Sequence, residues 1–234
     1  MRHPSSKATL KGETLRKAIL DVASKLFIER GLGGTSMQDI AAELGLTRTA
    51  VYYYFKNKQE ILKGLTEDVT LQAKRMTEIA AARRDVDAAA ALRELVEQYA
   101  LLILSRPAEF RVVERNEVDM PPKLAAAAET ARRGIFENFS ELIQRGIDSG
   151  EFRRSDARLA ALAILGMCNW SAWWFKPGGR KSEAEVASHI ADLAVHALLA
   201  QPRKGLAKPT VPERLQVLRD DLDHIAKLIS RSKA

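Results

Sequence analysis

Hydroxyl, phenol and cationic side chains gather between residues 35 and 58, at a spacing suited to binding phosphates and base edges. Two short stretches with helical periodicity meet at Gly45, which would supply a turn between them. On the second stretch, Val51 and Phe55 would face inward. The side chains left exposed at its front are Arg48, Thr49, Tyr52 and Tyr53. A short helix that presents hydroxyls and a guanidinium in this way has the geometry that enters a DNA major groove.

This segment resembles the N-terminal module of the TetR family of bacterial transcriptional regulators. The family's pattern is met, in order, by Thr35, Asp39-Ile40-Ala41, Gly45-Leu46-Thr47, Val51-Tyr52-Tyr53-Tyr54-Phe55 and Lys58. The resemblance covers residues 12–72, with the helix-turn-helix at about 35–54. One departure is Thr49, where the family often carries glycine. The operator preference of relatives therefore does not transfer to this chain.

The resemblance implies a role in DNA binding for ten residues. Phosphate contacts would come from Thr35, Ser36, Thr47, Tyr53 and Lys58, and base contacts from Arg48, Thr49 and Tyr52. Tyr54 would either bind phosphate or pack, and Lys56 belongs to the same face. Ordinary N-capping by Thr35 and Thr47, packing of Tyr52 and a solvated Lys58 are the structural alternatives. Arg2, Lys7 and Lys11 form either a basic arm or a tail without fixed contacts.

Helices alone are expected to position these residues. Alanine is abundant, and apolar residues recur at helical spacing, as from Leu15 to Phe27. Capping residues and prolines mark the boundaries. The predicted helices are about 15–30, 36–44, 47–54, 58–84, 85 or 87 to 106, 107 onward, 121–149, 155–175, 182–201 and 210–232. The fold class is therefore all-α.

The chain after residue 72 is expected to form a larger helical domain, residues 73–201, for ligand binding and dimerisation. The resemblance implies a homodimer in which helices 155–175 and 182–201 pair with their copies across a two-fold axis. Small residues on both helices suit close approach, although the same faces could pack within one chain. Residues 202–209 look like a basic hinge before an extra C-terminal helix, which we expect to pack within the dimer.

An apolar pocket with a basic rim is the expected effector site. Its predicted residues are Arg111, Arg115, Phe136, Phe139, Trp170 and Trp174, with Phe110 and Arg132 nearby. Such a pocket would suit an acyl-coenzyme A thioester from lipid, sterol or aromatic catabolism. Core packing of the aromatic residues and surface salt bridges of the arginines are the alternatives.

Composition bounds the function further. The 234 residues are 46% hydrophobic, and the net charge is +7. Residues 1–56 hold nine basic and five acidic residues, and residues 201–234 hold eight basic and four acidic residues. The segment between them is close to neutral. A basic N-terminal module fits a polyanionic partner such as DNA. No segment predicts a membrane span or a secretory signal, so a cytoplasmic protein without membrane contact is expected.

Enzymatic chemistry is not predicted. The sequence lacks a phosphate-binding loop and a His-Glu-x-x-His motif, and the histidines are scattered, so no metal site or cofactor is expected. Cys168 is expected to be buried and inert. The predicted function is a ligand-responsive DNA-binding repressor that an effector releases from its operator. The alternatives are a regulator of efflux or stress genes that responds to a drug-like ligand, and a protein-interaction adaptor.

Overall fold

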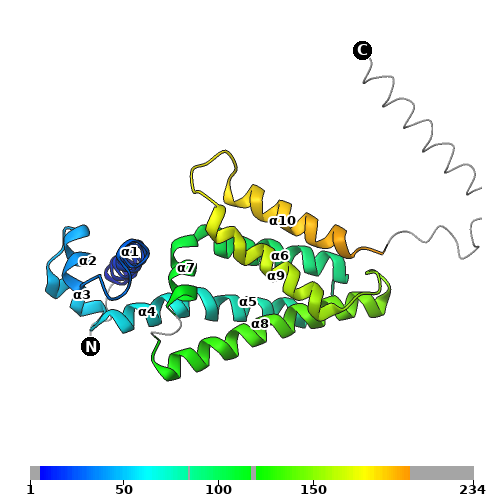
Figure 1. Ribbon diagram of the computed structural model, residues 1–234, viewed down its shortest axis with the longest axis horizontal. Helices are drawn as coiled ribbons and strands as arrows, with labels where there is room; N and C mark the ends of the chain where they lie inside the picture. Colours follow the sequence, from blue (N-terminus) through cyan, green and yellow to red (C-terminus); the bar gives the residue numbers. More distant parts are fainter. Residues whose placement is uncertain (1–5, 84, 117–119, 201–234) are drawn as a thin grey trace, which may run out of the picture. The chain divides into compact units, whose positions relative to one another are not determined.

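The computed structural model describes residues 6–83, 85–116 and 120–200, with side chains described from residue 13 onward. Within these ranges the chain forms helices and no strand, apart from an isolated antiparallel bridge between Phe152 and Leu199. The elements are α1 (Ser6–Arg30), α2 (Met37–Glu43), α3 (Arg48–Tyr54), α4 (Lys58–Thr66), η1 (Glu67–Leu71), α5 (Gln72–Ala82), α6 (Ala88–Ser105), α7 (Pro107–Arg115), α8 (Pro122–Ser149), α9 (Ala157–Trp174) and α10 (Glu183–Leu198) (Figure 1). The predicted all-α class is confirmed.

Helices α1–α4 form an N-terminal module around one buried cluster. Ile19 and Leu20 of α1, Val51 of α3 and Ile61 of α4 lie at its centre. Helix α1 begins at Ser6, earlier than the helix start near residue 15 that the sequence predicts. Lys7 and Lys11 consequently belong to a helix rather than to a tail without fixed structure.

The prediction of one continuous α-helix from 58 to 84 is wrong in two respects. The helical run is interrupted at Glu67–Leu71 by a π-helical segment, η1, and it ends at Ala82. The Thr66 hydroxyl donates to the Leu62 carbonyl at 2.8 Å, just before this segment. Such side-chain competition for a helical carbonyl bends helices locally. Isolated π-turns are often found at functional sites.

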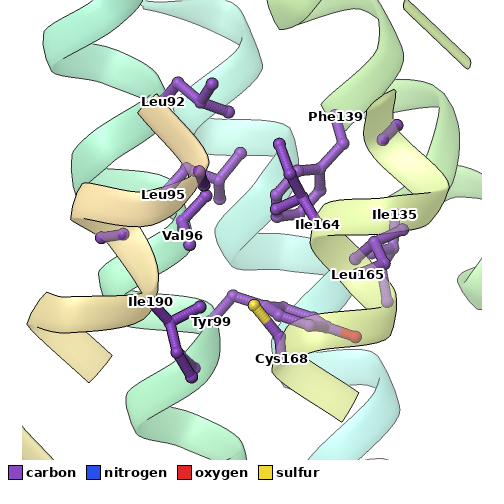
Figure 2. Packing of buried hydrophobic residues seen from close by; sticks show 14 of the residues in the cluster. Leu92, Leu95, Val96, Tyr99, Ile135, Phe139, Ile164, Leu165, Cys168 and Ile190 are labelled. Carbon is purple, nitrogen blue, oxygen red and sulfur yellow. The ribbon is translucent and has the colours of Figure 1, made fainter. Parts of the chain in front are cut away.

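Helices α5–α10 form a second module around a larger buried cluster (Figures 1 and 2). Leu92 and Leu95 of α6, Phe139 of α8 and Ile164 of α9 are packed together in it. Ser182 is the N-cap of α10, as the sequence predicts, and the structure selects Asp87 over Asp85 for α6 and Asp156 over Ser155 for α9. Gly150 ends α8 at φ +81°. Helix α10 ends at Leu198, three residues earlier than predicted, because Leu199 pairs with Phe152.

The two modules are joined through α7 as well as through the α4–η1–α5 run. Val112 and Val113 of α7 belong to the same buried cluster as α1 and α4. Phe110, on another face of α7, belongs to the cluster of the larger module. The predicted domain boundary at residue 72 stays a prediction, and so do the hinge and helix at 202–234, which lie outside the described residues.

Candidate functional site

Short-range hydrogen bonds hold α2 and α3 in a helix-turn-helix arrangement. The Ser36 hydroxyl accepts from the Asp39 amide at 3.1 Å, and the Asp39 carboxylate accepts from the Ser36 amide at 2.7 Å. The Ser36 hydroxyl also donates to the Asp39 carboxylate at 2.6 Å, and this bond, followed by the one from the Ser36 amide, keeps the pKa of the Asp39 carboxyl below its usual value. Gly45 takes φ +64°, a left-handed conformation that favours glycine. The Thr47 hydroxyl then caps α3 by accepting from the Ala50 amide at 3.3 Å.

The front of α3 is open to solvent. Tyr53 is 84% exposed, and Thr49 is exposed beside it. The Arg48 guanidinium lies over the Tyr52 ring, 5.0 Å from its centroid, and its Nη2 donates to the Tyr52 hydroxyl at 3.0 Å. Val51, on the opposite side of the helix, is fully buried. The structure therefore brings the predicted base-contacting residues together on one exposed face.

The predicted phosphate contacts divide into exposed residues and residues that support the fold. Ser36, Thr47, Tyr53 and Lys56 are exposed on the same side of the module as α3. Tyr54 is half-buried, and its ring meets that of Tyr53 edge-on at 5.1 Å. A shallow depression between the start of α2, α3 and the start of α4 includes Ser36, Tyr52 and Lys56 in its wall.

The predicted phosphate contact of the Thr35 side chain has to be corrected, and the one of Lys58 has to be qualified. The Thr35 side chain is 1% exposed, and its hydroxyl lies 3.2 Å from the Leu26 carbonyl oxygen and 3.0 Å from that of Gly31. A contact from this hydroxyl to DNA is thus excluded in this conformation. The Lys58 ammonium donates to the Leu32 carbonyl at 2.5 Å, so it ties the α1–α2 loop to α4. It can still donate to a phosphate, because an ammonium has three N–H groups.

The larger module encloses a small cavity of about 110 Å³. Polar groups from five elements line it: Thr70 of η1, Tyr99 of α6, Glu114 of α7, Arg132 of α8 and Asn169 of α9. The remaining lining is apolar and includes Phe110. The Tyr99 hydroxyl donates to the Asn169 side-chain oxygen at 3.0 Å, as its ring crosses from α6 toward α9 (Figure 2). Burial raises the pKa of Tyr99, so the phenol stays protonated.

The six predicted ligand residues do not line this cavity. Phe139 is packed edge-on against Tyr99 in the core, and Phe136 faces Arg158, whose guanidinium lies 4.4 Å from the ring centroid. Arg111 is half-buried and donates to the Pro107 carbonyl at 3.2 Å, whereas Arg115 is exposed. Phe110 and Arg132, predicted only as neighbours, are lining residues.

The two remaining ligand candidates, Trp170 and Trp174, belong to the surface. They are 64% and 50% exposed and border a groove between α9 and α10. Other large apolar side chains are also exposed on these two helices: Leu159, Leu162, Met167 and Leu193. Large apolar side chains exposed together on two helices are typical of an interaction site.

The remaining candidates for reactive chemistry are in unreactive settings. Cys168 of α9 is fully buried next to Tyr99 of α6 (Figure 2), and burial raises the pKa of its thiol to about 12. A buried, protonated thiol is a poor nucleophile. Within residues 6–83, 85–116 and 120–200, no group of three or more potential metal ligands comes together. Over the same part of the chain, no helix combines the length and the apolarity that crossing a bilayer requires.

An exposed helix-turn-helix face on a helical body defines a DNA-binding regulator. Residues 19–65 match the family described as "Bacterial regulatory proteins, tetR family", and residues 85–198 match "Tetracyclin repressor-like, C-terminal domain". The structure of the TetR-family regulator PfmR from Thermus thermophilus is 32% identical, with a TM-score of 0.67 over 76% of this chain and 97% of that one. The chain therefore belongs to the TetR family of transcriptional regulators and is not an enzyme.

Two further relatives are a transcriptional repressor and a protein solved with both a ligand and DNA. The transcriptional repressor KstR2 of Rhodococcus jostii is 28% identical over 78% of this chain and 90% of its own length. AibR, solved in complex with isovaleryl coenzyme A and operator DNA, is 25% identical, with a TM-score of 0.62 over 79% of this chain and 97% of that one.

Proposed function

We propose that this protein is a homodimeric repressor that a small effector releases from its operator. The observation that carries the proposal is the exposed face of α3. Val51 anchors the opposite side of the helix in the core, while this face presents four side chains to solvent: Arg48, Thr49, Tyr52 and Tyr53. Arg48 and Tyr52 would contact base edges together with Thr49. Ser36, Thr47, Tyr53, Tyr54, Lys56 and Lys58 would position the module on phosphates.

The proposed dimer forms through the exposed apolar face of α9 and α10. Pairing of these helices with their copies would cover Leu159, Leu162, Trp170 and Leu193. A two-fold axis there would bring the two copies of α3 to the same side of the dimer. They would enter successive major grooves of a palindromic operator, about 34–36 Å apart.

The proposed effector is an acyl thioester whose acyl group enters the cavity at Tyr99 and Asn169. At about 110 Å³ the cavity is smaller than a pocket for a drug-sized ligand, so it suits a short acyl group rather than a whole coenzyme A. Arg132 and the Tyr99–Asn169 pair supply the polar groups that a thioester carbonyl would meet. AibR, which was solved with isovaleryl coenzyme A, supports this class of ligand.

The cavity is well placed to influence DNA binding. Its lining includes Val69 and Thr70 of η1 and Phe110 of α7, and both elements also contact the N-terminal module. An effector that prefers a different arrangement of η1 and α7 would shift the population away from the DNA-bound conformation. No change of operator affinity is possible unless the effector distinguishes the two conformations.

Native mass spectrometry of the purified protein, followed by titration of promoter DNA from its own gene, tests the proposal. A dimer that binds this DNA and is released by isovaleryl coenzyme A would support both the repressor and the effector class. A DNA-binding dimer that ignores acyl thioesters but responds to hydrophobic drugs would favour an efflux or stress regulator. A dimer that binds no promoter DNA would favour an interaction adaptor.

A further inference from the structure

Arg16 of α1 connects the π-helical segment η1 to the end of α3. Its Nη1 atom lies 3.3 Å from Oδ2 of Asp68 in η1. Its guanidinium also lies over the ring of Phe55, the C-cap residue of α3, with Cζ 5.5 Å from the ring centroid. One side chain of α1 therefore contacts both η1 and the helix that carries the exposed DNA-binding face.

The position of the Arg16 guanidinium depends on a glycine in α4. Gly64 is buried, and a Cβ at this position would lie 3.1 Å from Arg16 Nη2 and 3.3 Å from Phe55 Cε1. Both distances are shorter than an ordinary van der Waals contact, so a side chain at residue 64 would crowd the guanidinium and the ring. The bare backbone of Gly64 thus lets the guanidinium and the Phe55 ring pack together against α4.

A second arginine holds Asp68 through its backbone. Arg106, the residue before α7, donates from Nη1 to the Asp68 carbonyl at 3.5 Å. The same nitrogen lies 3.9 Å from Oε2 of the buried Glu109. The two residues that follow Asp68 in η1, Val69 and Thr70, line the cavity of the larger module. A displacement of this cavity wall would therefore also move Asp68.

We propose that Arg16 is a positioning residue through which η1 fixes the end of α3. The Asp68 carboxylate orients the guanidinium, and the guanidinium supports the Phe55 ring. The Phe55 amide donates to the Val51 carbonyl at 3.0 Å and so closes the last turn of α3. When η1 moves, the ion pair is stretched, Phe55 loses this support, and the exposed face of α3 loses its fixed orientation.

This role deepens the proposed function, because it supplies a route from the cavity to the DNA-binding face, and it rests on that function where DNA is concerned. The expected effect is small. The side chains of Arg16 and Asp68 are 37% and 32% exposed, and a half-exposed ion pair changes an equilibrium by only about two- to threefold. The contact between the guanidinium and the Phe55 ring adds a factor of about two.

Amide hydrogen exchange of the full-length protein at the end of α3 tests this role without DNA. Asp68→Ala should lower the protection of the Tyr54 and Phe55 amides about threefold, although the substitution lies in η1. Arg16→Gln also removes the contact with the ring, so it should lower this protection about fivefold. Because both substitutions break the same connection, the double variant should lose no more protection than Arg16→Gln alone.

Two matched variants change charges beside this connection. Glu67→Ala, also in η1, removes the ion pair with Lys63, and Lys17→Gln changes the exposed cation next to Arg16. Both variants should keep the native protection of α3. The amides of α8 should keep their protection in every variant, because the loss of a positioning contact is local, whereas a general loss of stability lowers protection in both modules.

Native protection of α3 in Asp68→Ala would overturn the proposal, because Arg16 would then support Phe55 without η1. Additive losses in the double variant would overturn it too, and so would an equal loss in α8. If Arg16→Gln does not fold, the comparison of Asp68→Ala with Glu67→Ala decides.

Fluorescence anisotropy with promoter DNA adds a readout of function. Asp68→Ala should bind the promoter about threefold more weakly than the native protein, whereas Glu67→Ala should bind it equally well. Equal binding by both variants, in a protein that binds the promoter, would overturn the role of Arg16 in DNA binding. Because exchange requires no DNA, the connection through Arg16 can be confirmed even if promoter binding, and with it the proposed function, fails.

Discussion

Arg48 and Tyr52 form a preorganised pair on α3, in which the guanidinium lies 5.0 Å from the ring centroid and donates to the phenol oxygen at 3.0 Å. The stacking restricts both side chains before DNA arrives. Because the two side chains are already restricted in the free protein, less conformational entropy is lost when DNA binds. In the proposed complex with DNA, the pair would therefore present one fixed donor surface to base edges rather than two independent side chains.

Replacement of Arg48 by alanine should weaken operator binding by about 1–3 kcal/mol and relax sequence preference at one base pair, because a base-edge donor is lost. Fluorescence anisotropy with promoter DNA and single-base variants measures both effects. Lys56→Ala is the matched control and should weaken binding to all sequences alike, because a phosphate contact carries no sequence information. Equal losses on every sequence for Arg48→Ala would contradict its assignment to a base.

Tyr99→Phe should weaken effector binding about tenfold while operator binding remains, because the cavity loses a hydroxyl that holds Asn169 in place. The unpaired amide should also lower the free energy of unfolding by about 1 kcal/mol. Isothermal titration with isovaleryl coenzyme A and urea unfolding report the two effects. Gln98→Ala, on the exposed side of the same helix, should leave effector affinity unchanged.

Leu162→Lys should convert the proposed dimer into a folded monomer, because it places a charge in the apolar face of α9. Light scattering after size-exclusion chromatography gives the mass. Ile79→Lys tests the same substitution at an exposed site on α5, and its mass should stay dimeric. If the Leu162→Lys protein remains dimeric with native helicity, the dimer forms elsewhere.

Gly146→Ala should destabilise the fold by about 1–3 kcal/mol, because a Cβ at this position would collide with the Phe152 ring. Gly134→Ala lies in the same helix, where the new methyl group would make ordinary contact with the Lys74 side chain. It should be stabilising by about 0.5–1 kcal/mol. Urea unfolding of both variants measures the difference, and a neutral Gly146→Ala would show that Phe152 can move aside.

Local sequence signals predicted the features that depend on neighbouring residues. Gly45 and Thr47 mark the turn and the cap of α3, and Ser182 with Glu185 forms the capping box of α10. These features need only hydrogen bonds across a few residues, so they can be recognised in a single sequence.

Features that depend on packing between distant helices were less predictable. Thr35 opens α2 in the family pattern, yet its hydroxyl turns back toward the end of α1, which only the folded module reveals. The cavity residues Tyr99 and Asn169 are 70 positions apart. One signal could have revealed Asn169: it is a polar residue within the mostly apolar stretch 157–175. The arginines near aromatic residues suggested the rim of the effector pocket instead. In the structure, however, Arg111 donates to the Pro107 carbonyl and Arg115 is exposed to solvent.

The π-helical segment η1 also sets the rotational phase between the two ends of one long helical run. A residue in an α-helix turns the chain by about 100°, so adding or deleting one position within Glu67–Leu71 would turn α5 by that angle relative to α4. Ile61 and Leu65 face the core of the N-terminal module, whereas Val69 and Ala73 face the other cluster. The length of this segment is therefore a constraint in its own right, separate from the identity of its residues: an insertion or deletion of one residue would turn one of these faces away from its core.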